Sequence, residues 1–169
     1  MSGTGRAGDL PELKTVAKVE LTKYLGKWYE IYALPIIFEK KCAGGIAATY
    51  SLRPDGDIEV INECRTGAGK LVRVRGRAWV VDKKTNAKLK MTVIPWLKLN
   101  FLSEDCWILE LGPNYEYAVV GHPDRKYCWI LSRTPELPED VLKGIISRLL
   151  AYGYDFSKFT MTAQKDFKK

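Results

Sequence analysis

The sequence is poor in the residues on which most catalytic and metal sites depend. Its 169 residues include one histidine, His122, and four cysteines, none of them in a CxxC pair. A histidine-rich zinc site is therefore excluded, and zinc ribbons and thioredoxin-like redox motifs are not expected. Any Ser-His-Asp or Cys-His triad would have to use His122. We expect no metal and no cofactor.

The sequence also lacks long apolar runs, which stay far below the roughly 20 residues needed to cross a bilayer. Its first nine residues contain no apolar segment of the kind found in signal peptides, and Ser2 stands where a myristoylation motif requires glycine. A mature protein whose signal has been removed would begin in the same way. The net charge of +7, from 27 basic and 20 acidic residues, favours an acidic partner.

Short segments of alternating apolar and polar residues fill most of the chain. A turn signal at Arg53–Asp57 separates one pair, and within residues 71–80 valines alternate with arginines, as in half-buried antiparallel strands. Eight such segments at regular spacing predict a sandwich or an up-and-down barrel. They span residues 26–34, 46–52, 58–64, 71–80, 87–93, 105–111, 115–121 and 127–134.

A helix is predicted over residues 138–152. Pro138 suits its first turn, Glu139 and Asp140 suit its dipole, and Gly153 suits its end. Apolar residues from Val141 to Leu150 recur at helical spacing, so we expect this helix to pack on the outside of the sheet. A short strand is expected at 158–162. The predicted domain covers residues 16–164, between a flexible segment 1–15 and a tail 165–169.

Three motifs in this order resemble the signatures of the lipocalin family. They are Gly26-Lys-Trp28 on the first strand, Asn114-Tyr115-Glu-Tyr117 at the start of the seventh, and Trp129 to Arg133 on the eighth. The resemblance covers residues 16–164. Within the family, Ala48–Gly56 and Gly121–Tyr127 are most similar to bacterial outer-membrane lipocalins, plant temperature-induced lipocalins and apolipoprotein D. The resemblance implies an all-β, eight-stranded antiparallel up-and-down barrel, closed at one end, with a C-terminal helix outside and a short ninth strand.

The motif residues have an expected structural role. We expect the guanidinium of Arg133 to lie over the ring of Trp28 and to plug the closed end of the barrel, near Gly26 and Tyr115. Substitutions there should reduce stability before they change ligand specificity.

The resemblance implies an apolar ligand inside the barrel, transported or stored there. Residues in the apolar phase of each strand are the candidates for its contacts, and Tyr50, Trp107 and Trp129 are expected to sit higher in the cup than the others. A fatty acid or lysophospholipid fits, since burying a dozen methylenes is worth roughly 10 kcal/mol before association costs of about 4 kcal/mol or more. The candidate lining residues are Ala48, Tyr50, Val60, Val74, Ala78, Leu89, Met91, Trp107, Leu109, Val120 and Trp129.

The loops expected at the open end combine apolar tips with basic residues, as membrane-docking surfaces do. We expect contact with an anionic membrane there; the alternative is that the loops fold inward as a lid or form a dimer contact. A trimmed lipoprotein of the periplasm or outer membrane is the first expectation for location, and a cytosolic, membrane-peripheral protein the second. We expect a monomer or a weak dimer. The candidate membrane residues are Ile37, Phe38, Lys40, Lys41, Trp96, Leu97 and Lys98.

The resemblance also implies a disulfide between Cys42 and Cys64. Simple hairpin register places Cys64 opposite Ile46, so this bridge requires a bulge. Cys106 and Cys128 lie two strands apart and are expected to remain thiols. Two other functions stay open: a cysteine-dependent isomerase that uses Cys64, and a membrane-interaction module without a stored ligand. Otherwise we expect no enzyme activity.

An outward row formed by Arg73, Arg75 and Arg77, beside Lys88 and Lys90, raises the possibility of nucleic-acid binding. Only Trp79 would share this face as a stacking residue, so the aromatic platform of single-strand binders is missing. A charged, solvated barrel exterior is the better interpretation, and no nucleic-acid partner is expected.

Overall fold

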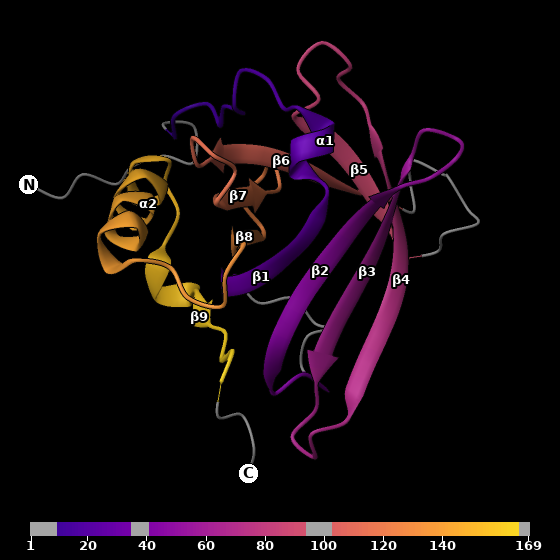
Figure 1. The fold of residues 1–169 in the computed structure, drawn as a ribbon. Helices are drawn as coiled ribbons and strands as arrows, with labels where there is room; N and C mark the ends of the chain where they lie inside the picture. Colours follow the sequence, from indigo (N-terminus) through magenta and orange to yellow (C-terminus); the bar gives the residue numbers. More distant parts are fainter. Residues whose placement is uncertain (1–9, 35–40, 94–102, 166–169) are drawn as a thin grey trace, which may run out of the picture.

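A computed structural model describes residues 10–34, 41–93 and 103–165 (Figure 1). Nine antiparallel strands form one sheet in the order β2-β3-β4-β5-β6-β7-β8-β1-β9, and β1 also pairs with β2, which closes the first eight strands into a barrel. The predicted fold is confirmed. Its strands are β1 Gly26–Ala33, β2 Gly44–Leu52, β3 Ile58–Arg65, β4 Leu71–Val80, β5 Lys88–Thr92, β6 Glu104–Leu111, β7 Tyr117–Gly121, β8 Cys128–Ser132 and β9 Thr160–Met161.

Three short elements differ from the sequence prediction. Helix α1, Leu21–Tyr24, was not predicted, because four residues are too few to show helical periodicity. Strand β7 begins at Tyr117 instead of residue 115, because Tyr115 lies in the preceding turn with φ of 58°. The segment expected to be a strand at 158–162 begins as the 3₁₀-helix η3, Phe156–Lys158, and only two residues of β9 pair with β1.

The barrel and the helix enclose two separate cores. The inner core fills the barrel and includes the wholly buried side chains of Trp28, Ile58 and Val60. The outer core lies between the barrel and α2, Glu139–Ala151, whose buried residues are Ile145 and Leu149. The predicted helix therefore packs outside the barrel, beside β7 and β8 (Figure 1). Leu13, within the segment expected to be flexible, is buried in the same outer core.

The C-terminal segment closes a seam between β1 and β2. These strands pair with each other only from Gly26 to Tyr29, and beyond that point β1 pairs with β9. The side-chain amide of Gln164 then donates to the carbonyl oxygens of Glu30 and Ile46, at 2.7 and 2.8 Å. One side chain thus joins the two separated strands. None of the described helices is long and apolar enough to cross a membrane.

Candidate ligand-binding site

The closed end of the barrel is built around Trp28. The guanidinium carbon of Arg133 lies 3.7 Å from the centroid of the Trp28 ring, as predicted. Gly26 has φ of 102°, and a Cβ there would lie 3.2 Å from Nη1 of Arg133, so glycine suits this position both sterically and conformationally. Arg133 also donates to the backbone carbonyl oxygens of Lys23, Tyr24, Lys27 and Tyr115. These contacts fix α1 as the floor of the barrel.

Side chains fill most of the space directly above this floor. Tyr24 and Tyr50 pack with their ring centroids 5.3 Å apart. A void of about 10 Å³ remains, which is near the smallest space that holds one water molecule. Tyr50 therefore lies at the floor, lower in the cup than expected. The void is lined by Tyr24, Tyr50, Ala78, Leu89, Met91, Cys106, Ile108 and Val120.

Most of the predicted lining residues lie on the inner side of the barrel. Ala48, Val60 and Val120 belong to the inner core, and Trp129 packs against it. Their contact with a ligand stays a prediction.

Strand β6 is the exception, and the expected inward placement of Trp107 and Leu109 is wrong. Both belong to the outer core beside α2, while Cys106 and Ile108 face the interior. The helix buries the outer face of this strand, so β6 is apolar on both faces and alternation could not identify the inner one. Lys88 extends over the ring of Trp107, with Nζ 4.1 Å from the centroid.

In the described part of the chain, nothing closes the other half of the barrel. Val74 lies opposite Asn62 on β3 and on the same face of β4 as Gly76 and Ala78, yet it is 47% exposed. Val72, two residues nearer the strand end, is 37% exposed on that face. In Figure 1 the long strands β2, β3 and β4 extend past the shorter strands at this end. Val72 and Val74 are apolar, lie on the inner face and are still exposed, so this half of the barrel forms an open cup.

Tyr127 and Asn62 are among the inward residues of this half that sequence reasoning missed. Tyr127 is buried next to Trp129, with ring centroids 4.9 Å apart, and its hydroxyl donates to Glu104. Asn62 is partly buried, and it is the only residue of β3 that places a side-chain amide on the inner face. Their inward phase on β8 and β3 follows from the same alternation that places Trp129 and Val60 on the inner face.

A disulfide joins the open end to the barrel wall. Cys42 and Cys64 are bonded, with their Cα atoms 5.6 Å apart. The register of β2 against β3 shifts between Gly44 and Ala47, which is the bulge that the pairing required. Cys106 and Cys128 are free and buried, as expected.

The disulfide also bears on the catalytic alternative. That alternative needs a Cys64 thiol, and this sulfur is bonded to Cys42. Burial raises the pKa of Cys106, the free cysteine of the inner core, to about 12. At neutral pH its sulfur is a neutral thiol and a weak nucleophile.

The predicted membrane residues fall mostly outside the described part of the chain. Ile37, Phe38, Lys40, Trp96, Leu97 and Lys98 lie outside it, and of this set only Lys41 is described, where it is exposed.

Two basic residues of the β7–β8 turn, at the same end of the barrel, have local partners. Arg125 donates to the carbonyl oxygens of Tyr152 and Pro11, and Lys126 pairs with Glu104 at 3.1 Å. Apart from Lys126, the exposed cations of the described rim are Lys41 and, around the β3–β4 turn, Arg65 and Lys70.

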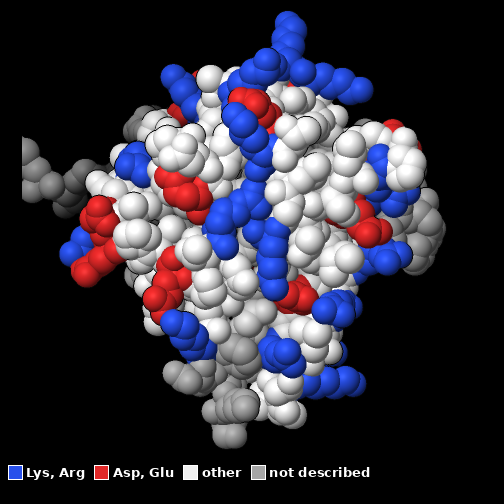
Figure 2. All heavy atoms as spheres, in the orientation of Figure 1, with Lys and Arg blue, Asp and Glu red and all other residues white. Residues whose placement is uncertain are grey.

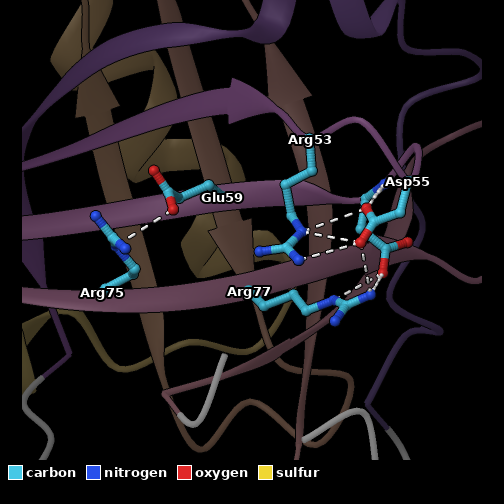
Figure 3. Close-up of polar contacts among 6 residues, drawn as sticks. Arg53, Asp55, Glu59, Arg75 and Arg77 are labelled. Carbon is cyan, nitrogen blue, oxygen red and sulfur yellow. Dashed lines mark hydrogen bonds and ion pairs between the residues drawn. The ribbon is translucent and has the colours of Figure 1, made fainter. Parts of the chain in front are cut away.

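The outward arginine row of β4 is paired with acidic residues. Arg73 contacts Glu63, and Arg77 contacts Asp57 at 2.6 Å. Figure 3 shows Arg75 beside Glu59, at 3.2 Å, and Arg77 beside Asp55, at 3.1 Å. Figure 2 shows a band of basic side chains down one face with acidic side chains beside it. Trp79 is 6% exposed and offers no free stacking surface. This arrangement fits a solvated exterior of ion pairs.

Comparison with known proteins agrees with the fold and the motifs. The family model described as a lipocalin-like domain matches residues 19–164. Temperature-induced lipocalin-1 of Arabidopsis thaliana is 37% identical over 158 residues, covering 92% of this chain and 84% of the relative. The chain belongs to the lipocalin family, whose barrels bind small hydrophobic ligands.

Further relatives span the same group. The outer membrane lipoprotein Blc of Escherichia coli K12 is 33% identical, covering 88% of this chain and 81% of that protein. Apolipoprotein D of Mus musculus is 34% identical, covering 93% and 83%. Among solved structures, insecticyanin from the tobacco hornworm Manduca sexta has a TM-score of 0.70 at 24% identity, covering 91% of this chain and 85% of that one, which supports the fold.

Proposed function

We propose that this lipocalin transports or stores a lipid with a single hydrocarbon chain, such as a fatty acid or lysophospholipid, in the open half of its barrel. The observation that carries the proposal is the exposed apolar inner face formed by Val72 and Val74. The floor below it is filled, so the hydrocarbon occupies the cup and a polar head lies near the mouth.

The free energy of burying the hydrocarbon chain is large enough for a lipid carrier. Burial of about a dozen methylenes contributes roughly 10 kcal/mol, and association costs of at least ~4 kcal/mol leave roughly micromolar affinity or better. No Lys or Arg is expected among the inner contacts, because Arg133 is held at the closed end. Affinity should therefore depend on chain length more than on the charge of the head.

Adjacent residues on opposite faces of β4 allow a direct test. Val74→Trp fills the cup, whereas Arg75→Trp adds the same ring to the outer face, where Arg75 is 64% exposed in its side chain. We expect palmitate, titrated by calorimetry, to bind Val74→Trp at least tenfold more weakly than wild type and Arg75→Trp within twofold of it. Circular dichroism verifies folding of both variants. Equal binding by wild type and Val74→Trp would place the ligand elsewhere.

We further propose that the open end exchanges its lipid at anionic membranes. The support is the cluster of exposed cations around one side of the rim, Lys41, Arg65 and Lys70, next to the exposed inner valines. The names of the bacterial relatives, outer membrane lipoproteins, favour a location in the cell envelope as a trimmed lipoprotein. The alternative is a cytosolic, membrane-peripheral location, and it stays open because another relative is a plant protein.

Co-sedimentation with vesicles tests this second proposal. Wild type should sediment with phosphatidylcholine vesicles that contain phosphatidylglycerol and much less with phosphatidylcholine alone. Serine substitution of Lys41, Arg65 and Lys70 together should abolish the difference. The matched control replaces Lys18, Lys83 and Lys84, which are exposed at the closed end, with the same loss of charge. Absence of wild-type binding to either vesicle would overturn the proposal.

A further inference from the structure

Three polar side chains meet at the otherwise apolar floor of the cup. Tyr24 reaches it from α1, Tyr50 from β2 and Cys106 from β6, and all three are less than 10% exposed. Together they line the void of about 10 Å³, whose other lining residues are apolar. A polar group buried in an apolar interior lowers the free energy of unfolding unless it is hydrogen-bonded. We therefore expect these side chains to have a hydrogen-bond partner.

The two phenols bring two O–H donors to this void, and their rings pack beside it with centroids 5.3 Å apart. If one hydroxyl donates to the other, the proton of the second still needs an acceptor. The neighbouring sulfur of Cys106 is only a weak acceptor. Burial raises the pKa of both phenols, so both protons are present at neutral pH.

The void beside these groups has room for about one oxygen atom and its protons. An oxygen with free lone pairs placed there would accept the remaining phenol proton. We infer that the floor is a subsite for one oxygen at the buried end of the ligand, a hydroxyl or carbonyl oxygen on an otherwise apolar chain. This rests on the proposed function, because the rest of the chain occupies the cup.

Access to the subsite passes Met91. This residue lines the void, and its position on β5 is one inward step nearer the open end than Leu89. Its unbranched, flexible side chain can move aside for a chain that reaches the floor. On the wall formed by β2, β3 and β4, Ala48 and Ala78 have small side chains that occupy little of the interior beside this path.

A water molecule would satisfy the same hydrogen bond, so the test must separate the two sources of oxygen. The probes are palmitate and 16-hydroxypalmitate, which differ only in a hydroxyl at the far end. The variants are Tyr24→Phe and Tyr50→Phe, which keep the rings. Tyr117→Phe, in the outer core, is the matched control.

We expect wild type to bind 16-hydroxypalmitate about fivefold more tightly than palmitate, the net effect of one hydrogen bond. The preference should disappear or reverse in Tyr24→Phe and Tyr50→Phe and remain in Tyr117→Phe. Equal affinity of wild type for both probes would mean that the void holds water or stays empty, and would overturn the inference alone. A preference that survives both floor variants would also overturn it. Failure of wild type to bind either probe would overturn the proposed function as well.

Discussion

The guanidinium of Arg133 covers the ring of Trp28 at 3.7 Å and, at the same time, donates hydrogen bonds to the backbones of three segments. These segments are α1, the start of β1 and the turn before β7. One side chain therefore holds the N-terminal helix, the first strand and a late turn of the chain together. The floor of the cup, including Tyr24, depends on this contact.

Arg133→Lys tests the role of this contact. Lysine keeps the charge but cannot reproduce the planar stacking or the several donors of arginine. We expect a loss of about 2 kcal/mol in the free energy of unfolding, because a partly buried cation–π contact and charged hydrogen bonds are each worth about 1–3 kcal/mol. Urea denaturation measures the loss. Palmitate affinity of the folded variant should stay within threefold of wild type; a large loss of affinity without a loss of stability would assign Arg133 to the ligand instead.

Gln164→Ala tests the seam between β1 and β2. The substitution removes two hydrogen bonds that bridge Glu30 and Ile46 across the seam, so we expect a destabilisation of about 1–2 kcal/mol. Hydrogen exchange should accelerate near Ile46 more than in α2. Lys165→Ala, at the exposed neighbouring residue, is the control. Unchanged exchange at the seam would show that the pairing of β9 alone holds it.

The pH dependence of stability should depend on Glu63. Hydrogen bonds from Lys27 and Arg73 lower the pKa of this carboxyl below its ordinary 4.5. A lowered pKa contributes stability that is present above the unfolded value and is lost as the pH falls through the folded value.

The corresponding variant is Glu63→Gln, which should lose less stability than wild type between about pH 5 and about pH 3. Urea denaturation at several pH values measures this, with the exposed Glu139→Gln as control. If the free energy of unfolding of wild type and of Glu63→Gln changed with pH in the same way, the pairing of Glu63 with Lys27 and Arg73 would be contradicted.

Reduction of the disulfide should loosen the open end. The Cys42–Cys64 bond closes a loop with a sequence separation of 22, for which loop-closure entropy predicts about 3 kcal/mol. We expect wild type to lose about this much on reduction, and Cys42→Ser/Cys64→Ser to be insensitive to reductant. Mass spectrometry with thiol alkylation should find two free thiols before reduction and four after it. Four free thiols in the untreated protein would contradict the bond.

The strands were predictable because alternation is a local pattern, and it is clear along β1 to β4. The choice of a barrel and the plug formed by Trp28 and Arg133 depended on the resemblance to lipocalin motifs. The lining was less predictable. On β6, burial against α2 makes both faces apolar, and Trp107 was therefore assigned to the wrong face.

Contacts between distant segments were out of reach of local patterns. Tyr24 enters the cup from a four-residue helix, and the seam joins Gln164 to β1 and β2 across more than 100 residues. Neither leaves a periodic signal in the sequence. Asn62 could have been found, since its phase on β3 is that of Val60.

We propose above that the open cup holds a lipid with a hydrocarbon chain. Native mass spectrometry of the purified protein, followed by extraction and identification of what it carries, tests this most directly. We expect a bound species of fatty-acid or lysophospholipid mass, or its appearance at one-to-one stoichiometry after incubation with palmitate, and its absence from Val74→Trp. A spectrum showing only bare protein after incubation with both lipid classes would contradict the claim.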